Sequence, residues 1–142
     1  MAPQTQKALV VPTERAPWEL RTDWPVPSVG PRDVLVKLVA AALNPADWRI
    51  QANGIWFVKD YPYLGGVDGA GIIEEVGAEV TNFVKGDKMY VLCRSFSILM
   101  LKTVHMPWNS ISLTQGGFPK NMTFTEYCAV PAETIAKVRA SF

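Results

Sequence analysis

The sequence predicts a mainly β fold, a distorted barrel of short strands with one or two short helices. Two apolar runs, residues 34–39 and 124–130, place apolar side chains on one strand face, as half-buried strands do. A glycine-dense segment at 65–77 reads as a turn, a strand and a second turn. Prolines divide the remaining runs, and short strands separated by turns favour a barrel.

The chain length limits the number of domains. With 142 residues, of which 49% are hydrophobic, the chain can bury one core but hardly two. We therefore expect a single domain over residues 1–142.

The first two strands are expected at residues 8–11 and 34–39, both of which are apolar. The segment between them is rich in residues that forbid a long helix, so an irregular connection is predicted there. These residues are Pro17, Pro25, Pro27, Gly30 and Pro31.

One short helix is expected after the second strand. Asn44 can cap a helix, and Pro45 suits the first helical position because its fixed φ matches the helix and its missing N–H is not needed there. The helix should end near Gly54.

Two further strands are expected downstream. Residues 65–71 are predicted to form a turn, residues 72–76 a strand that Gly77 closes, and Gly86-Asp87 the next turn. A half-buried strand is predicted at 124–130, before Pro131, with Cys128 as a buried structural thiol.

Charge and hydropathy exclude several classes of partner. Lys and Arg total 14 against 13 Asp and Glu, so the chain has no net field to hold a nucleic acid. The N-terminus lacks an apolar run of signal-peptide length, and the run at 96–101 is interrupted by Lys102. We expect a cytoplasmic protein with no membrane partner, whose two cysteines remain thiols.

Three motifs together carry a family resemblance. Residues 42–48 read ALNPADW, residues 62–65 read PYLG and lead into DGAG at 68–71, and residues 124–127 read FTEY. With these motifs the chain resembles the N-terminal, GroES-like domain of medium-chain dehydrogenases and reductases, on the zinc-independent quinone oxidoreductase and enoyl reductase branch. The resemblance implies a GroES-like barrel from about Lys7 to Val138.

The resemblance implies hydride transfer from NADPH to an enone or a quinone. Asn44 and Asp47 become the candidate catalytic residues, with Asn44 on the nicotinamide side. Asn44 also suits a helix cap, a role compatible with the first. The other candidates also have structural explanations. Asp47 is alternatively a solvated carboxylate, Trp48 a buried indole, and Tyr61 and Tyr63 packing residues. The candidate substrate-cleft residues are Trp48, Tyr61, Tyr63, Val67 and Asp68.

No metal site is expected. Zinc-dependent relatives carry a cysteine where this sequence has Asn44, and a Gly-His-Glu where it has Gly66-Val67-Asp68. Asparagine and valine do not replace thiolate and imidazole as zinc ligands. The remaining candidates match no compact ligand spacing. These are Cys93, His105 and Cys128.

Two departures from the family pattern affect the interpretation. From Lys88 to Thr125 no residue is acidic, and residues 93–113 look inserted, either by aberrant splicing or as a lineage-specific surface loop. No Rossmann fingerprint follows, because the glycines at 66–71 precede a strand rather than a helix.

Three functional hypotheses follow. The first is a truncated NADPH-dependent reductase that contributes the substrate-side domain and is inactive alone. The second is a binding module or nonfunctional paralogue whose exposed interdomain face could form a homodimer. The third is a co-chaperonin of the GroES type, since the barrel is shared but fold does not transfer function.

Overall fold

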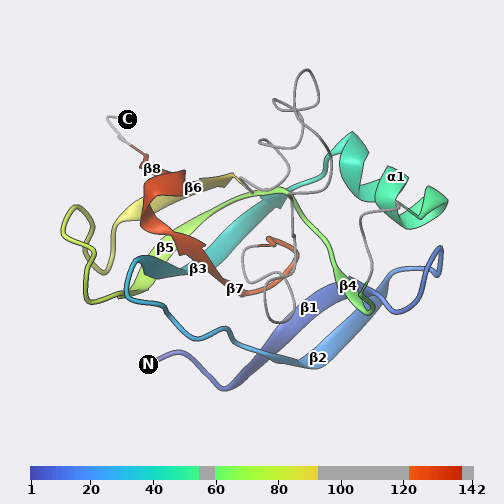
Figure 1. The fold of residues 1–142 in the computed structure, drawn as a ribbon, viewed down its shortest axis with the longest axis horizontal. Helices are drawn as coiled ribbons and strands as arrows, with labels where there is room; N and C mark the ends of the chain where they lie inside the picture. The colour runs from blue at the N-terminus through green and yellow to red at the C-terminus, as the bar shows by residue number, and fades with distance from the viewer. Residues whose placement is uncertain (55–59, 93–121, 139–142) are drawn as a thin grey trace.

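Two antiparallel sheets make up the described part of the chain (Figure 1). The computed structural model describes residues 1–54, 60–92 and 122–138. The first sheet has the strand order β2-β1-β4 and the second β7-β3-β5-β6-β8. The strands are β1 (Thr5–Val11), β2 (Glu19–Pro25), β3 (Asp33–Ala42), β4 (Tyr63–Leu64), β5 (Asp68–Val76), β6 (Lys88–Leu92), β7 (Tyr127–Pro131) and β8 (Ile135–Lys137).

The predicted mainly β class is confirmed. The described residues contain one α-helix, α1 (Pro45–Asn53), and one short 3-10 helix, η2 (Ala132–Thr134). β3 lies between β5 and β7 and continues the strand that was predicted at 34–39. Figure 1 shows α1 just beyond the end of β3, far from β8 on the opposite side of the molecule.

The connection predicted as irregular contains a strand instead. β2 occupies residues 19–25 and pairs antiparallel with β1 at the edge of its sheet. The prolines in this segment suggested a loop. Proline is nevertheless compatible with an edge strand, where only one side of the backbone is paired. Pro25 ends β2, while the buried Trp24 anchors the strand to the core.

The glycine turn predicted at 65–71 is shorter than expected, because Gly69 and Gly71 lie inside β5. A side chain at Gly71 would collide with the backbone carbonyl of Lys37 on β3. The β3–β5 pairing also shifts register twice. Glycine therefore serves here for the close approach of two strands.

The helix and the last predicted strand are found close to their expected positions. α1 begins at Pro45 and ends at Asn53, with Gly54 as its C-cap. β7 starts later than the predicted strand, so Phe124 precedes it and Thr125 forms an isolated bridge to Ala8.

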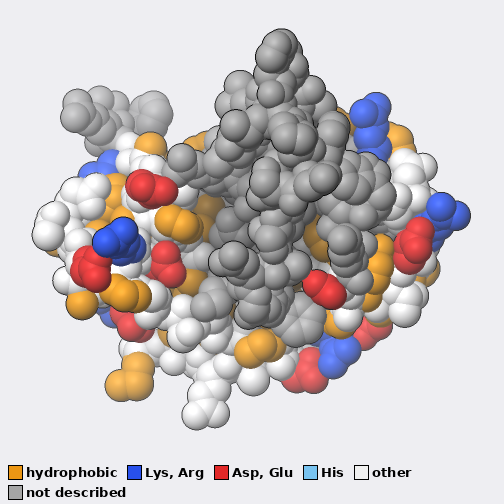
Figure 2. All heavy atoms as spheres, viewed as in Figure 1, with side chains coloured by type: hydrophobic (Ala, Val, Ile, Leu, Met, Phe, Trp, Pro, Cys, Tyr) orange, Lys and Arg blue, Asp and Glu red, His pale blue; other side chains and the backbone are white. Residues whose placement is uncertain are grey.

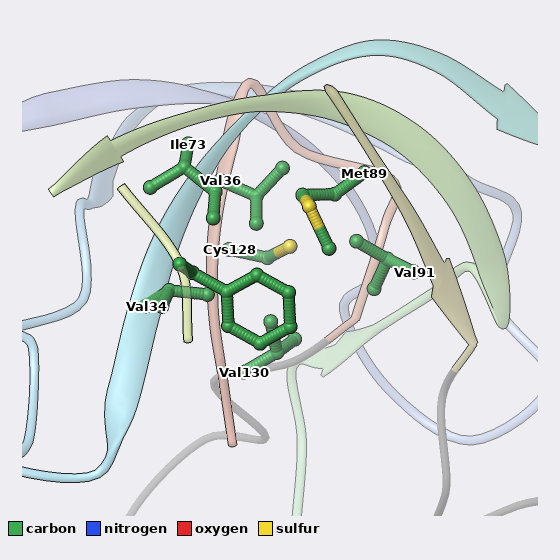
Figure 3. Packing of buried hydrophobic residues seen from close by; sticks show 8 residues of the cluster. Val34, Val36, Ile73, Met89, Val91, Cys128 and Val130 are labelled. Atoms are coloured by element: carbon green, nitrogen blue, oxygen red, sulfur yellow. The ribbon is translucent and has the colours of Figure 1, made fainter. Parts of the chain in front are cut away.

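The main hydrophobic core lies on the five-stranded sheet. Figure 3 shows its side chains pointing toward one another from β3, β5, β6 and β7. Cys128 is fully buried among them, as the sequence predicted for a structural thiol. The buried members are Val34, Val36, Ile73, Phe83, Met89, Val91, Cys128 and Val130.

A second apolar cluster lies against the three-stranded sheet and joins it to the loop after β4. Its buried members are Ala8, Val10, Trp24, Leu64, Val67 and Met122, with Tyr63 packed against them. The side chain of Trp18 contacts Phe124 edge-on, with ring centroids 5.7 Å apart. The segment before β7 is thus packed onto the first sheet.

The surface carries both signs of charge. On the face drawn in Figure 2, acidic and basic side chains are interspersed over the described residues. Within the described ranges, no helix is long and apolar enough to cross a membrane. The predicted insert at 93–113, with Cys93 and His105, lies outside the described residues.

Candidate functional site

Three sequence-predicted residues meet where β3 runs into α1. Ala42, the last residue of β3, pairs with Asp68, the first residue of β5. This register brings Asn44, two residues further on, beside Asp68, and the Asn44 Nδ2 donates a hydrogen bond of 3.2 Å to Asp68 Oδ2. The β3–β5 pairing therefore joins positions 24 residues apart in the chain.

Asn44 also occupies the N-cap of α1. Its backbone is extended, with φ −114° and ψ 151°. Its backbone N–H donates to Asp47 Oδ2 at 2.8 Å, which is the returning half of a capping box. The position of Asn44 therefore combines the cap with a side-chain contact to Asp68.

Asp47 is buried, with 5% of its surface exposed, so its reading as a solvated carboxylate is wrong. Burial raises the pKa of the Asp47 carboxyl above its ordinary value, and the negative charge of Asp68 raises it further. Backbone N–H groups of Asn44 and Gly66 oppose this rise. The first turn of α1 therefore carries a carboxyl group that ionises less readily than an ordinary aspartate.

Within the described part of the chain, each of the two carboxyl groups has one buried oxygen without a hydrogen-bond partner. These atoms are Asp47 Oδ1 and Asp68 Oδ1. Buried polar atoms are nearly always partnered in native proteins, and an unpartnered one often marks a functional site. The cluster thus offers two acceptor atoms to a proton or to a hydrogen-bond donor.

Sequence reasoning missed Thr123, which completes the cluster. Thr123 is buried, and its hydroxyl donates to the backbone carbonyl of Asp68 at 2.9 Å. Its backbone N–H donates to the carbonyl of Gly66 at 3.2 Å. No local pattern marks Thr123, since its contacts are made across more than fifty residues of sequence.

The Trp48 and Val67 side chains are not part of the carboxyl cluster. Trp48 is 55% exposed, so its reading as a buried indole is wrong. The guanidinium of Arg49 stacks over its ring at 5.5 Å, which helps to hold the indole on the surface of α1. The Val67 side chain packs in the second apolar cluster, where Tyr63 also lies.

Tyr61 lies near the other end of α1. The pKa of its phenol is raised by burial and by the charge of Glu14, while Arg15 lowers it. Arg15 itself donates to the carbonyl of Asn53, the last residue of the helix. A nine-residue helix is about 13 Å long, so Tyr61 is not grouped with Asn44.

An open, mainly apolar pocket of about 360 Å³ lies between β1, the end of β3 and the segment before β7. Its lining includes Leu9, Leu20, Leu43 and Phe124. Thr123 also lines this pocket and contacts Asp68, so it connects the pocket to the carboxyl cluster.

Metal-ligating side chains do not gather in the parts of the chain that the structure describes: no three of His, Cys, Asp and Glu are close enough to hold an ion there. At the position where zinc-dependent relatives carry histidine, the Val67 side chain is buried among apolar groups. Among the described residues, the Asn44 amide and the Val67 side chain do not fit a zinc ion.

The family model of the alcohol dehydrogenase GroES-like domain matches residues 30–140. Alcohol dehydrogenase 1 of Caenorhabditis elegans is 32% identical over 139 residues, which are 96% of this chain and 39% of that protein. The chloroplastic quinone-oxidoreductase QR1 of Triphysaria versicolor is 39% identical over 75 residues, 51% of this chain and 22% of that protein.

Solved structures show the same fold. The structure of an alcohol dehydrogenase superfamily protein from Novosphingobium aromaticivorans has a TM-score of 0.71 and 27% identity, and the similarity covers 96% of this chain and 35% of that one. The chain thus spans about two fifths or less of the length of the proteins it matches.

Proposed function

This chain belongs to the family of alcohol dehydrogenase GroES-like domains of medium-chain dehydrogenases and reductases, and we propose that it supplies the substrate-side domain of an oxidoreductase that uses NADPH. The observation that carries the proposal is the cluster of Asn44, Asp47 and Asp68 beside the pocket-lining Thr123. It gathers polar groups at the junction of β3 and α1.

The proposed reaction needs no zinc. The amide of Asn44 and the buried Val67 side chain stand where a zinc site would need ligands. An acceptor that stabilises its own developing charge can take a hydride without a metal. Conjugated enones and quinones have this property, so we propose them as the substrate class.

The side chains would then orient the substrate and stabilise charge. NADPH, when bound, supplies the hydride. The second N–H of the Asn44 amide can donate to an enolate or phenolate oxygen, because only one N–H is needed for Asp68. The apolar pocket that includes Leu43 can bury the hydrocarbon part of the acceptor and exclude water.

The proposal also concerns partners and location. We propose small molecules rather than polyanions as its partners, because its 14 basic and 13 acidic residues give no polyanion-binding field. A cytoplasmic location is also proposed. A homodimer is proposed through exposed apolar side chains outside the pocket, such as Val39.

The first test is the acceptor and metal dependence of the endogenous protein, isolated through a tag on this chain. We expect NADPH oxidation with an enone or a quinone, at the same rate before and after treatment with EDTA. NADH replaces NADPH as the cofactor control. If neither acceptor supports oxidation, the proposed activity is wrong, and if Zn²⁺ restores a rate that EDTA abolished, the metal-free mechanism is wrong.

A second test separates the two roles of Asn44. Asn44→Ala and Asn44→Ser are each expected to lower kcat at least about tenfold, since a hydrogen bond to a charged group contributes about 1.5–3 kcal/mol. Serine is as good an N-cap as asparagine, so Asn44→Ser should lower Tm less than Asn44→Ala does, by losing only the hydrogen bond to Asp68, while it loses as much activity. Wild-type kcat in Asn44→Ser would show that Asn44 is a cap alone.

A further inference from the structure

The carboxyl groups of Asp47 and Asp68 form a linked pair. Asn44 bonds to both, through its backbone N–H to Asp47 and through its side-chain amide to Asp68. The charge of Asp68 acts on Asp47, and each carboxyl keeps one buried oxygen without a partner. Two negative charges in such a place are unfavourable.

Compensating cations are not found among the groups that act on Asp47. From α1, the nearest basic residue in sequence is Arg49, whose guanidinium lies over the exposed Trp48 ring. From the β4–β5 loop and the start of β5 come the Gly66 backbone and Asp68. The segment before β7 supplies Thr123, whose hydroxyl is directed to the Asp68 carbonyl.

Binding of one proton would remove the repulsion between the two carboxyl groups. Protonating one carboxyl removes a charge and converts one unpartnered acceptor into a donor. Asp47 is the more buried of the two, and burial is the largest cause of its raised pKa. Asp47 is therefore the better place for the proton.

We propose that the buried Asp47 carboxyl group keeps its proton in weakly acidic solution and presents an O–H beside the Asp68 carboxyl group. The Asp68 carboxyl group keeps the Asn44 amide in place through its hydrogen bond. The start of α1 thereby becomes a pH-sensitive element. This inference does not rest on the proposed reductase activity, because the titration involves no substrate.

The sign of the stability effect follows from the direction of the pKa shift. The folded state holds the Asp47 proton more tightly than the unfolded chain does, since its pKa is raised. The stabilisation is fully present below the unfolded pKa of about 3.9 and is lost as the pH rises through the folded pKa. Asp47→Asn should remove this part of the pH dependence.

The direct test is a pH titration of the aspartate carboxyl carbons of the full chain by ¹³C NMR. Asp87 is an internal reference, because a hydrogen bond from Lys137 holds its pKa below the ordinary value. We expect Asp47 to titrate at a higher pH than Asp87, because the pKa of Asp47 is raised and that of Asp87 is lowered. Asp68→Asn should lower the Asp47 midpoint, and Asp87→Asn should leave it unchanged.

Three results would overturn the proposal. The first is an Asp47 midpoint at or below that of Asp87 in the wild-type chain, which needs no variant to fold. The second is an unchanged Asp47 midpoint in a folded Asp68→Asn variant, because the two groups would then not be coupled. The third is a fall of the midpoint below about 3.9 on adding Mg²⁺, which would assign the pair to a cation.

Discussion

Replacing Gly66 by alanine is expected to lower the free energy of unfolding by about 2–5 kcal/mol. Gly66 has φ +93°, a conformation that is strained for any residue with a Cβ. An added Cβ would also lie 2.5 Å from the backbone nitrogen of Phe124 and 2.6 Å from the Thr123 hydroxyl. Backbone atoms cannot rotate away as a long side chain can, so the segment before β7 must shift. Urea denaturation measures the effect.

Gly86→Ala is the matched control. Gly86 has nearly the same backbone conformation, with φ +94°, but a Cβ there would meet nothing within 4 Å. This variant should lose only the strain of the left-handed conformation, about 1 kcal/mol. If both variants lose the same amount, contact with Thr123 and Phe124 does not determine the need for glycine at 66.

Truncating Ile73 to alanine is expected to cost about 2–5 kcal/mol. Ile73 is fully buried in the main core, on the strand that lies between β3 and β6, and Figure 3 draws it among the other core side chains. Alanine loses the burial of three carbon atoms and leaves a cavity that the surrounding sheet cannot fully close. The free energy of unfolding in urea reports the loss, and an unchanged m-value would show that both states keep their compactness.

Ile72→Ala provides a control of the same chemistry on the same strand. Ile72 is 39% exposed and lies on the opposite face of β5. Its truncation should cost about 1 kcal/mol or less, the range of strand propensity. Equal losses at the two positions would contradict the assignment of the core to the Ile73 face.

The helix start shows how far local sequence reasoning reaches. Asn44, Pro45 and Gly54 predicted both ends of α1 because caps and the first helical turn depend on nearby residues. The strands β1, β3 and β7 were predicted for a similar reason, since their alternation is visible within each segment.

Other elements could not be found in this way. β2 is polar and flanked by prolines, and it becomes a strand because β1 offers a pairing partner. Gly69 and Gly71 look like turn residues until the approach of β3 is known. Trp48 looks like a core residue, yet its position on α1 directs it to the surface. In each case the deciding neighbour is far away in the sequence.

The candidate site, too, could be predicted from the sequence only in part. The sequence by itself determined the class of fold and the ends of α1, because propensity and capping are local properties. Its resemblance to the family made Asn44, Asp47 and Asp68 candidates. Only the tertiary structure decided that Asp47 is buried, that Asp68 faces Asn44, and that Thr123 joins them. Burial and hydrogen-bond geometry depend on strand register, which is set by packing across the whole sheet.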